Sequence, residues 1–122
     1  MARILLAEDE ETLRSMLVRA FAPEHSVTAA GDGAEALDII NASKGEFDLL
    51  LTDIRMPLMD GIALALAGAR DYPEITILLM TGFADQRERA SGLDALVHDV
   101  ITKPFSLAQI RDAVGGALAA RQ

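Results

Sequence analysis

Short apolar runs alternate along this chain with longer segments in which apolar residues recur at every third or fourth position. Five of the short runs have the length of strands, and they occupy residues 3–7, 26–30, 47–52, 75–80 and 97–102. Several of these runs show no alternation of polar and apolar residues. Uninterrupted apolar strands are typical of a sheet with helices on both faces.

The segments between the runs are predicted to be helices, because they carry start and stop signals. We expect Thr12 to cap the first helix and Ser106 to cap the last. Proline residues follow two of the segments and stop them. The predicted helices begin after Thr12 and after Gly33, span residues 62–69 and 84–93, and begin again after Ser106.

Five strand–helix units in succession predict a parallel α/β fold. Right-handed crossovers between the strands lead to a flavodoxin-like, doubly wound (βα)5 sandwich of three layers. The expected strand order is 2-1-3-4-5. We find no linker or repeat, so we predict a single domain over residues 1–122 with no output domain.

Composition excludes several classes of function. The 122 residues contain 11 Lys+Arg against 19 Asp+Glu, a net charge of −8, and no cysteine. Disulfides, thiol nucleophiles and cysteine zinc sites are therefore absent, and the acidic excess argues against binding nucleic acid. No apolar stretch approaches the roughly 18 residues that span a bilayer, and no signal-peptide pattern follows Met1. We expect no membrane insertion and a cytoplasmic location.

Polar residues that could carry chemistry follow four of the predicted strands. They are Glu8, Asp9, Asp53, Thr81 and Lys103. Because ligands bind at the carboxyl ends of the strands in open α/β sheets, these residues are expected to meet at one edge. Each alone is compatible with a turn or a solvated surface, and their joint placement favours a site.

The chemistry of this set points to phosphoryl transfer. Three neighbouring carboxylates repel one another and need a compensating cation, and all-oxygen ligands suit Mg²⁺. Asp53 could attack an activated phosphoryl group and form an acyl phosphate. A lysine ammonium from Lys103 and a hydroxyl from Thr81 would stabilise the charged oxygens.

Four motifs, in order, resemble the receiver domain of two-component response regulators over essentially the whole chain. They are Ile4-Leu5-Leu6-Ala7-Glu8-Asp9-Glu10, Leu51-Thr52-Asp53-Ile54-Arg55-Met56-Pro57-Leu58-Met59-Asp60-Gly61, Met80-Thr81-Gly82 and Lys103-Pro104-Phe105. The resemblance implies that Asp53 accepts a phosphoryl group from a histidine kinase or a histidine phosphotransfer protein. The chain would be no enzyme beyond its own phosphorylation and dephosphorylation.

The same resemblance assigns the metal site. Glu8 and Asp9 correspond to the acidic pair of the family, and Asp9 and Asp53 would bind Mg²⁺ beside the backbone carbonyl of Arg55. Lys103 would contact the phosphoryl group. Pro104, expected after a cis bond, would shape the loop that aims that lysine.

The predicted switch departs from the family in one place. Thr81 corresponds to the switch hydroxyl, but Val100 stands where an aromatic residue is common. An aliphatic side chain cannot make the usual ring movement. Phe83 is either a partner contact or a ring packed on the helix that follows. Neither Arg55 nor Phe83 can orient an attacking water, so we expect slow loss of the phosphoryl group.

Three segments also resemble the CpdR-type single-domain receivers of alphaproteobacteria: Arg3-Ile4-Leu5-Leu6-Ala7-Glu8-Asp9, Leu50-Leu51-Thr52-Asp53-Ile54 and Thr81-Gly82-Phe83-Ala84. This resemblance implies a downstream protein target, and a phosphorylation-controlled adaptor role for the ClpXP protease.

Other interpretations fit the residues less well. Gly31-Asp32-Gly33-Ala34-Glu35-Ala36 matches a dinucleotide fingerprint, but it follows the second strand and is better explained as a turn that starts a helix. An aspartyl-phosphate hydrolase would need an acid where Arg55 stands. His25 and His98 have no nucleophile elbow nearby. A pseudo-receiver that binds partners without phosphorylation stays open as the alternative.

Overall fold

The fold is a five-stranded parallel sheet enclosed by helices, as predicted. The computed structural model describes residues 1–82, 90–93 and 95–121. The strands are β1 (Arg3–Ala7), β2 (Ser26–Ala30), β3 (Leu49–Asp53), β4 (Thr76–Thr81) and β5 (Asp99–Thr102). The helices are α1 (Glu11–Phe21), α2 (Gly33–Ala42), α3 (Gly61–Asp71), the 3-10 turn η1 (Ser91–Leu93) and α5 (Leu107–Ala119). The sheet order is β2-β1-β3-β4-β5, which confirms the flavodoxin-like prediction.

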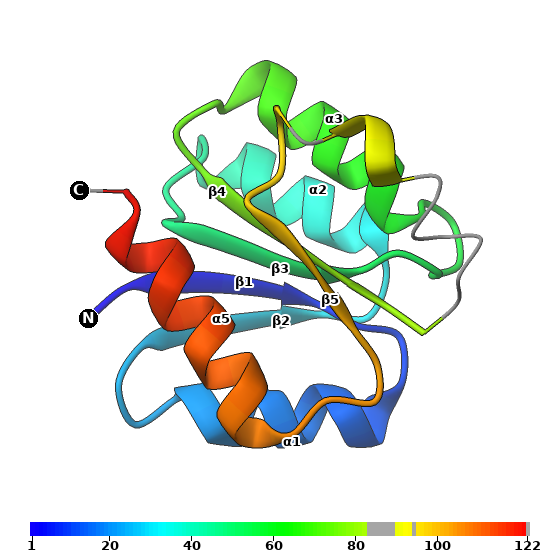
Figure 1. Ribbon diagram of the computed structural model, residues 1–122. Helices are drawn as coiled ribbons and strands as arrows, with labels where there is room; N and C mark the ends of the chain where they lie inside the picture. The colour runs from blue at the N-terminus through cyan, green and yellow to red at the C-terminus, as the bar shows by residue number, and fades with distance from the viewer. Residues whose placement is uncertain (83–89, 94, 122) are drawn as a thin grey trace.

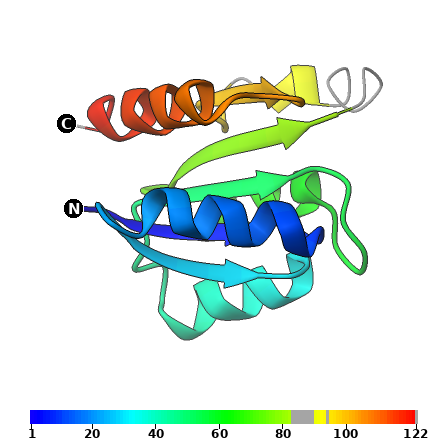
Figure 2. The same ribbon diagram turned by 90° about the horizontal axis from the view of Figure 1, so that it is seen from below.

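Two separate hydrophobic cores flank the sheet. Helices α2 and α3 cover one face, and α1 and α5 cover the other (Figure 1). Figure 2 shows the sheet between these layers and both chain ends on the same side of the molecule. Side chains of each central strand alternate between the cores: Leu5 of β1 packs toward α2 and α3, whereas Ile4 and Leu6 pack toward α1 and α5. No described helix combines the length and apolar character needed to cross a membrane.

The strand at the centre is shorter at its start, and longer at its end, than the sequence suggests. β3 begins at Leu49 because Phe47 lies in a tight turn, where its N–H donates to the Gly45 carbonyl at 2.8 Å. All five residues of β3 are buried, and Asp53 is the last of them. The strand pairing, Asp53 opposite Met80, therefore fixes the backbone of Asp53 within the sheet.

The helix starts follow capping chemistry with one exception. Ser106 accepts from the Gln109 N–H in a reciprocal capping box, as predicted, and Asp60 caps α3. The prediction of Thr12 as a cap is wrong: α1 begins at Glu11, and Glu10 takes the N-cap position without a side-chain bond. The chain is instead turned by the Glu8 carboxylate, which accepts from the Glu10 N–H at 3.0 Å.

The predicted helix over residues 84–93 falls mostly outside the described residues. Its last part appears as the 3-10 turn η1. After that turn, the N–H groups of Leu96 and Val97 both donate to the Leu93 carbonyl, at 2.8 and 2.9 Å. These bonds delay the start of β5 to Asp99, two residues later than expected.

Candidate functional site

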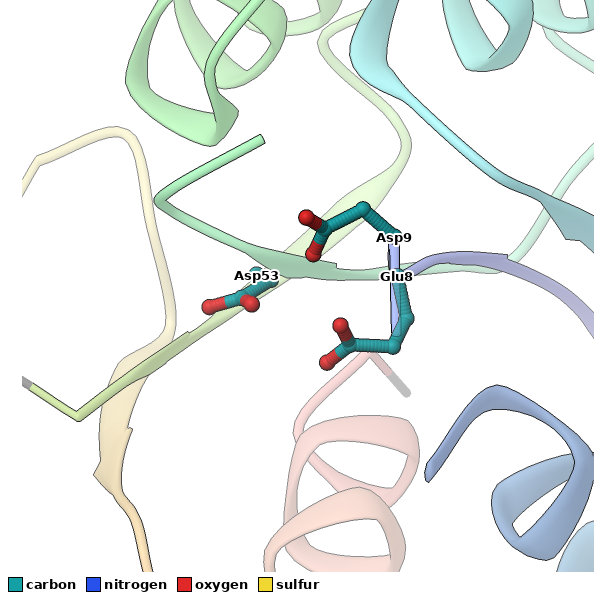
Figure 3. Close-up of side chains that lie close together, drawn as sticks. All are labelled: Glu8, Asp9 and Asp53. Atoms are coloured by element: carbon teal, nitrogen blue, oxygen red, sulfur yellow. The ribbon is translucent and has the colours of Figure 1, made fainter. Parts of the chain in front are cut away.

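Three carboxylates gather at the carboxyl ends of β1 and β3. Glu8 and Asp9 follow β1, and Asp53 ends β3. One oxygen from each lies within 4.8 Å of the others, and the three side chains face a common space in Figure 3. Glu8 and Asp53 are buried, whereas Asp9 is exposed. The sequence prediction that these acids meet at one sheet edge is confirmed.

Lys103 bridges two of these acids. Its Nζ donates to Glu8 Oε1 and to Asp53 Oδ2, each at 3.0 Å. The backbone N–H of Lys103 also donates to the Thr81 carbonyl at 2.7 Å, which ties the loop after β5 to the end of β4. The peptide bond from Lys103 to Pro104 is cis, as expected. The lysine side chain is 24% exposed, so the ammonium sits at the boundary between the acids and solvent.

The Asp53 carboxylate is held by its surroundings. Its Oδ1 accepts from the Ile54 N–H at 2.9 Å, and its Oδ2 accepts from Lys103. The Asp53 backbone carbonyl accepts from the Thr52 hydroxyl at 2.9 Å. With 6% of the residue exposed, only a small part of Asp53 is open to an incoming group. A fixed and narrowly accessible carboxylate is suited to attack in one direction.

Burial changes the acid–base properties of Glu8. The desolvation of this fully buried side chain raises its pKa to about 7, and the nearby Asp53 charge adds to the rise. The Glu10 N–H and the Lys103 ammonium act in the opposite direction. For Lys103, burial lowers the pKa, but its bonds to Asp53 and Glu8 outweigh that effect and raise the pKa above its ordinary value.

A pocket of about 470 Å³ opens over this cluster. Its lining residues are Asp9, Asp53, Arg55, Met56, Pro57, Gly82 and Lys103. Glu8 and Thr81 are not among them, because both are buried beneath the surface. The pocket therefore presents two acids, the lysine and the arginine to a ligand. Glu8 lies beneath the pocket surface and affects a ligand only through its hydrogen bond with Lys103.

The remaining predicted residues lie in three kinds of environment. Thr81 ends β4 and is 1% exposed. Val100 is half-buried in β5 and packs against the core on the α2 and α3 side. Pro104 follows Lys103 at the start of the loop to α5. The Phe83 prediction lies outside the described residues.

Two residues that support the site were not singled out in the sequence. Arg14 of α1 donates from Nη1 to the Glu8 carbonyl at 2.9 Å, and this bond fixes the turn after β1. Gly61 lies so close to the strand end that a Cβ at this position would stand 2.0 Å from the Asp53 carbonyl oxygen. The glycine before the predicted third helix was the one available signal, since a close backbone approach needs glycine.

The donor set fits a hard divalent cation. Three carboxylates face the Lys103 ammonium, and the Arg55 guanidinium also lines the pocket, which leaves one negative charge uncompensated when all three acids are ionised. Oxygen donors of this kind, open to solvent on one side, match the preference of Mg²⁺ for a few carboxylates and several waters. A phosphate oxygen could complete such a site.

Comparison with known proteins identifies this arrangement. The family model described as "Response regulator receiver domain" matches residues 4–115. The chain belongs to this family. Receiver domains work in two-component signalling, where they interact with histidine kinases and downstream effectors. The family resemblance found in the sequence is thereby confirmed.

Relatives and solved structures agree with this assignment. The chain is 38% identical over 120 residues to the transcriptional activator protein PfeR of Pseudomonas aeruginosa, covering 98% of this chain and 38% of that protein. It spans less than half the length of the curated relatives it matches. A receiver domain from Clostridium thermocellum shares the fold with a TM-score of 0.89 at 20% identity, covering 99% and 97% of the two chains. The response regulator TrrA of Thermotoga maritima, solved with Mg(2+)-BeF, has a TM-score of 0.82 at 24% identity, covering 96% and 99%.

Proposed function

We propose that Asp53 accepts a phosphoryl group from a phosphohistidine of a histidine kinase or phosphotransfer protein. A carboxylate oxygen of Asp53 forms a bond to phosphorus while the phosphorus–nitrogen bond of the donor breaks. The electron pair of the broken bond stays on the imidazole, which leaves as the neutral base once it holds a proton. The product is an acyl phosphate on Asp53.

The observation that carries this proposal is the double contact of Lys103 with Glu8 and Asp53. Phosphoryl transfer spreads negative charge over the equatorial oxygens, and a positioned ammonium stabilises that charge. Lys103 is held at 3.0 Å from the attacking carboxylate by a second, fully buried acid. This geometry places a cation at the mouth of the reaction site before any ligand arrives.

We propose Mg²⁺ as the cofactor, held by Asp9, Asp53 and the backbone carbonyl of Arg55, with Glu8 at the edge of the set. The support is the acidic cluster, together with the pocket that Asp9, Asp53 and Arg55 line. The Mg(2+)-BeF complex of TrrA shows that one protein of this fold has been solved with the ion. When bound, the ion would neutralise charge on the transferring group.

We further propose that phosphorylation acts on partner binding through the Thr81 hydroxyl. A hydrogen bond from the Lys103 N–H to the Thr81 carbonyl joins the loop after β5 to the end of β4. A phosphoryl group that attracts either residue therefore moves both segments. Val100 packs as an aliphatic residue against the core, so the proposed output runs through these loops without an aromatic relay.

The wider role is also a proposal. The three sequence segments shared with CpdR-type receivers support a stand-alone receiver, in the cytoplasm, that controls delivery of substrates to ClpXP. A pull-down with ClpX from unphosphorylated and beryllofluoride-treated protein tests it. Equal or absent capture in both states would contradict the adaptor role and leave the phosphorylation chemistry untouched.

The decisive experiment is phosphorylation with acetyl phosphate, read by intact mass. We expect wild type to gain one phosphoryl group in Mg²⁺ and none in EDTA. Asp53→Asn should gain none in either buffer, and Asp38→Asn, which changes an exposed acid on α2, should behave as wild type. Absence of metal-dependent gain in wild type would overturn the proposal and favour the pseudo-receiver that works without phosphorylation.

A further inference from the structure

The loop from β3 to α3 contains a strained turn at Leu58. The Met59 N–H donates to the Pro57 carbonyl at 2.7 Å, which closes a three-residue turn with Leu58 at its centre. The φ angle of Leu58 is +68°. A γ-turn with positive φ is rare, and a branched leucine is disfavoured in this backbone region, which glycine occupies without strain. Lys44 also has positive φ, but it lies in the turn after α2, where this conformation is common.

Packed residues anchor the turn on both sides. On the N-terminal side, Met56 is buried in the core on the α2 and α3 face. After it, Met59 packs against the core, and its carbonyl lies where Gly33 leaves space, since a Cβ there would come within 2.1 Å. The Gly61 N–H donates to the Ile54 carbonyl at 2.7 Å and closes the loop. The conformation of Leu58 is therefore imposed by its neighbours.

The Leu58 side chain buries little of its surface on folding. It is 85% exposed, against 44% for Leu66 and 43% for Leu96, and among the large hydrophobic residues described only Met1 is more exposed. The backbone is strained and the apolar side chain stays in water. Strained residues that the surrounding structure holds in place cluster at functional sites. Because its neighbours fix the backbone of Leu58, the apolar side chain is presented outward and less backbone freedom remains to be lost when a partner binds.

The position of the loop indicates which partner. Pro57, adjacent to Leu58 in the turn, lines the same pocket as Asp53 and Lys103. Asp53 is reached through this pocket, so a protein that brings a phosphohistidine to Asp53 must cover the rim that Pro57 forms. A small-molecule phosphodonor can enter the pocket without touching the rim.

We infer that Leu58 is a specificity contact, and that it inserts into an apolar recess beside the phosphohistidine of the donor protein. This inference rests on the proposed function. The contact contributes binding energy to the protein donor alone. Burial of a leucine side chain corresponds to roughly a 10- to 100-fold change in kcat/KM for that donor.

The test compares two phosphodonors on the same variants. The protein donor is the histidine kinase that, autophosphorylated with ATP, transfers fastest to wild type among a purified panel. The small donor is acetyl phosphate. Leu58→Ala removes the side chain and keeps the strained backbone, whereas Leu58→Gly removes both. Leu66→Ala, a partly exposed leucine on α3, is the control for loss of apolar surface.

We expect both Leu58 variants to slow transfer from the kinase at least 10-fold, with acetyl phosphate rates and Leu66→Ala unchanged. Leu58→Gly should also melt at the same temperature as wild type or higher. Unchanged kinase rates, or equal slowing with both donors, would overturn the Leu58 contact and leave the proposed function standing. Phosphorylation by acetyl phosphate but by no phosphohistidine donor would overturn the Leu58 contact together with the donor named in the proposed function, and would leave only the phosphoryl-accepting chemistry of Asp53. Absence of phosphorylation of wild type by any donor would overturn both.

Discussion

The Lys103 ammonium donates to the Asp53 carboxylate across 3.0 Å, although the two residues are 50 positions apart in the chain. Their meeting follows from parallel strand pairing, since Asp53 ends β3 and Lys103 directly follows β5, with β4 between them. The pair balances one charge of the site before any cation binds. Because Lys103 compensates part of the carboxylate charge, a change of this lysine should alter how the site binds a metal ion.

Removal of the Lys103 charge should increase the affinity for Mg²⁺. Lys103→Met takes away the one ammonium that competes with a metal ion for the carboxylates, so we expect Mg²⁺ to bind about tenfold more tightly. The same variant should be phosphorylated far more slowly by acetyl phosphate. Isothermal titration calorimetry measures the first effect. Lys44→Met changes the net charge equally at an exposed turn, and equal gains in both variants would contradict a local role.

The stability of the metal-free protein should fall as the pH rises toward 8. Folding raises the pKa of Glu8 from 4.5 to about 7, so the folded state holds a proton that the unfolded state has released. The stabilisation linked to this proton is complete below pH 4.5 and is lost as the pH passes 7. The loss amounts to about 3 kcal/mol at most.

Urea denaturation in EDTA at a series of pH values tests this Glu8 effect. Glu8→Gln keeps the shape of the side chain without its charge, so its free energy of unfolding should decline less than that of wild type between pH 5 and 8. Parallel pH profiles for the two proteins would show that Glu8 does not titrate in this range.

A methyl group at Gly61 should disrupt the site. The new Cβ of Gly61→Ala would stand 2.0 Å from the Asp53 carbonyl oxygen, a backbone atom that cannot move aside cheaply. We expect a loss of about 3 kcal/mol or more in the free energy of unfolding. The control is Gly115→Ala in α5, where the added Cβ would meet no described atom within 4 Å apart from its chain neighbours and the nearby backbone of its own helix.

Gly115→Ala should stabilise the protein by about 0.5–1 kcal/mol, because alanine loses less backbone entropy in a helix. Thermal melts of both variants give the comparison. A tolerated Gly61→Ala would mean that the loop after β3 is free to shift away from the strand end.

The phosphoryl group on Asp53 should be lost slowly. Arg55 lines the pocket two residues beyond Asp53, and a guanidinium cannot accept a proton from an attacking water. Arg55→Asn introduces an amide oxygen that can orient a water, and it should shorten the half-life of the acyl phosphate several-fold. Phosphate release from purified, phosphorylated protein measures this decay. A half-life of seconds for wild type, or no change in the variant, would contradict the role of Arg55.

The sequence was sufficient to predict the sheet order and the meeting of Glu8, Asp9, Asp53 and Lys103. Those features follow from apolar runs and from which residue comes after each run. The N-cap of α1 was mispredicted because the bond that turns the chain comes from the Glu8 side chain rather than from a residue with cap propensity.

Other features depend on contacts between distant segments. The pKa of Glu8 depends on complete burial under Lys103, and the strained turn at Leu58 depends on how Met59 and Gly61 pack. Hydrophobic periodicity does not report such close approaches, and a glycine such as Gly61 signals only that the backbone there can be approached closely. They are set by the distance between elements, which appears only when the chain is folded.

Because the two hydrophobic cores lie on opposite faces of the sheet, substitutions in one core can accumulate with little effect on the other. Residues of the α1 and α5 layer have their apolar contacts in one core, and the loop that carries Leu58 rests on the other. Substitutions in clusters that share no side-chain contacts have nearly additive effects on stability. A lineage can therefore change apolar residues of the α1 and α5 layer with little effect on the packing beneath the loop that carries Leu58, as long as Arg14 keeps its hydrogen bond to the turn after β1.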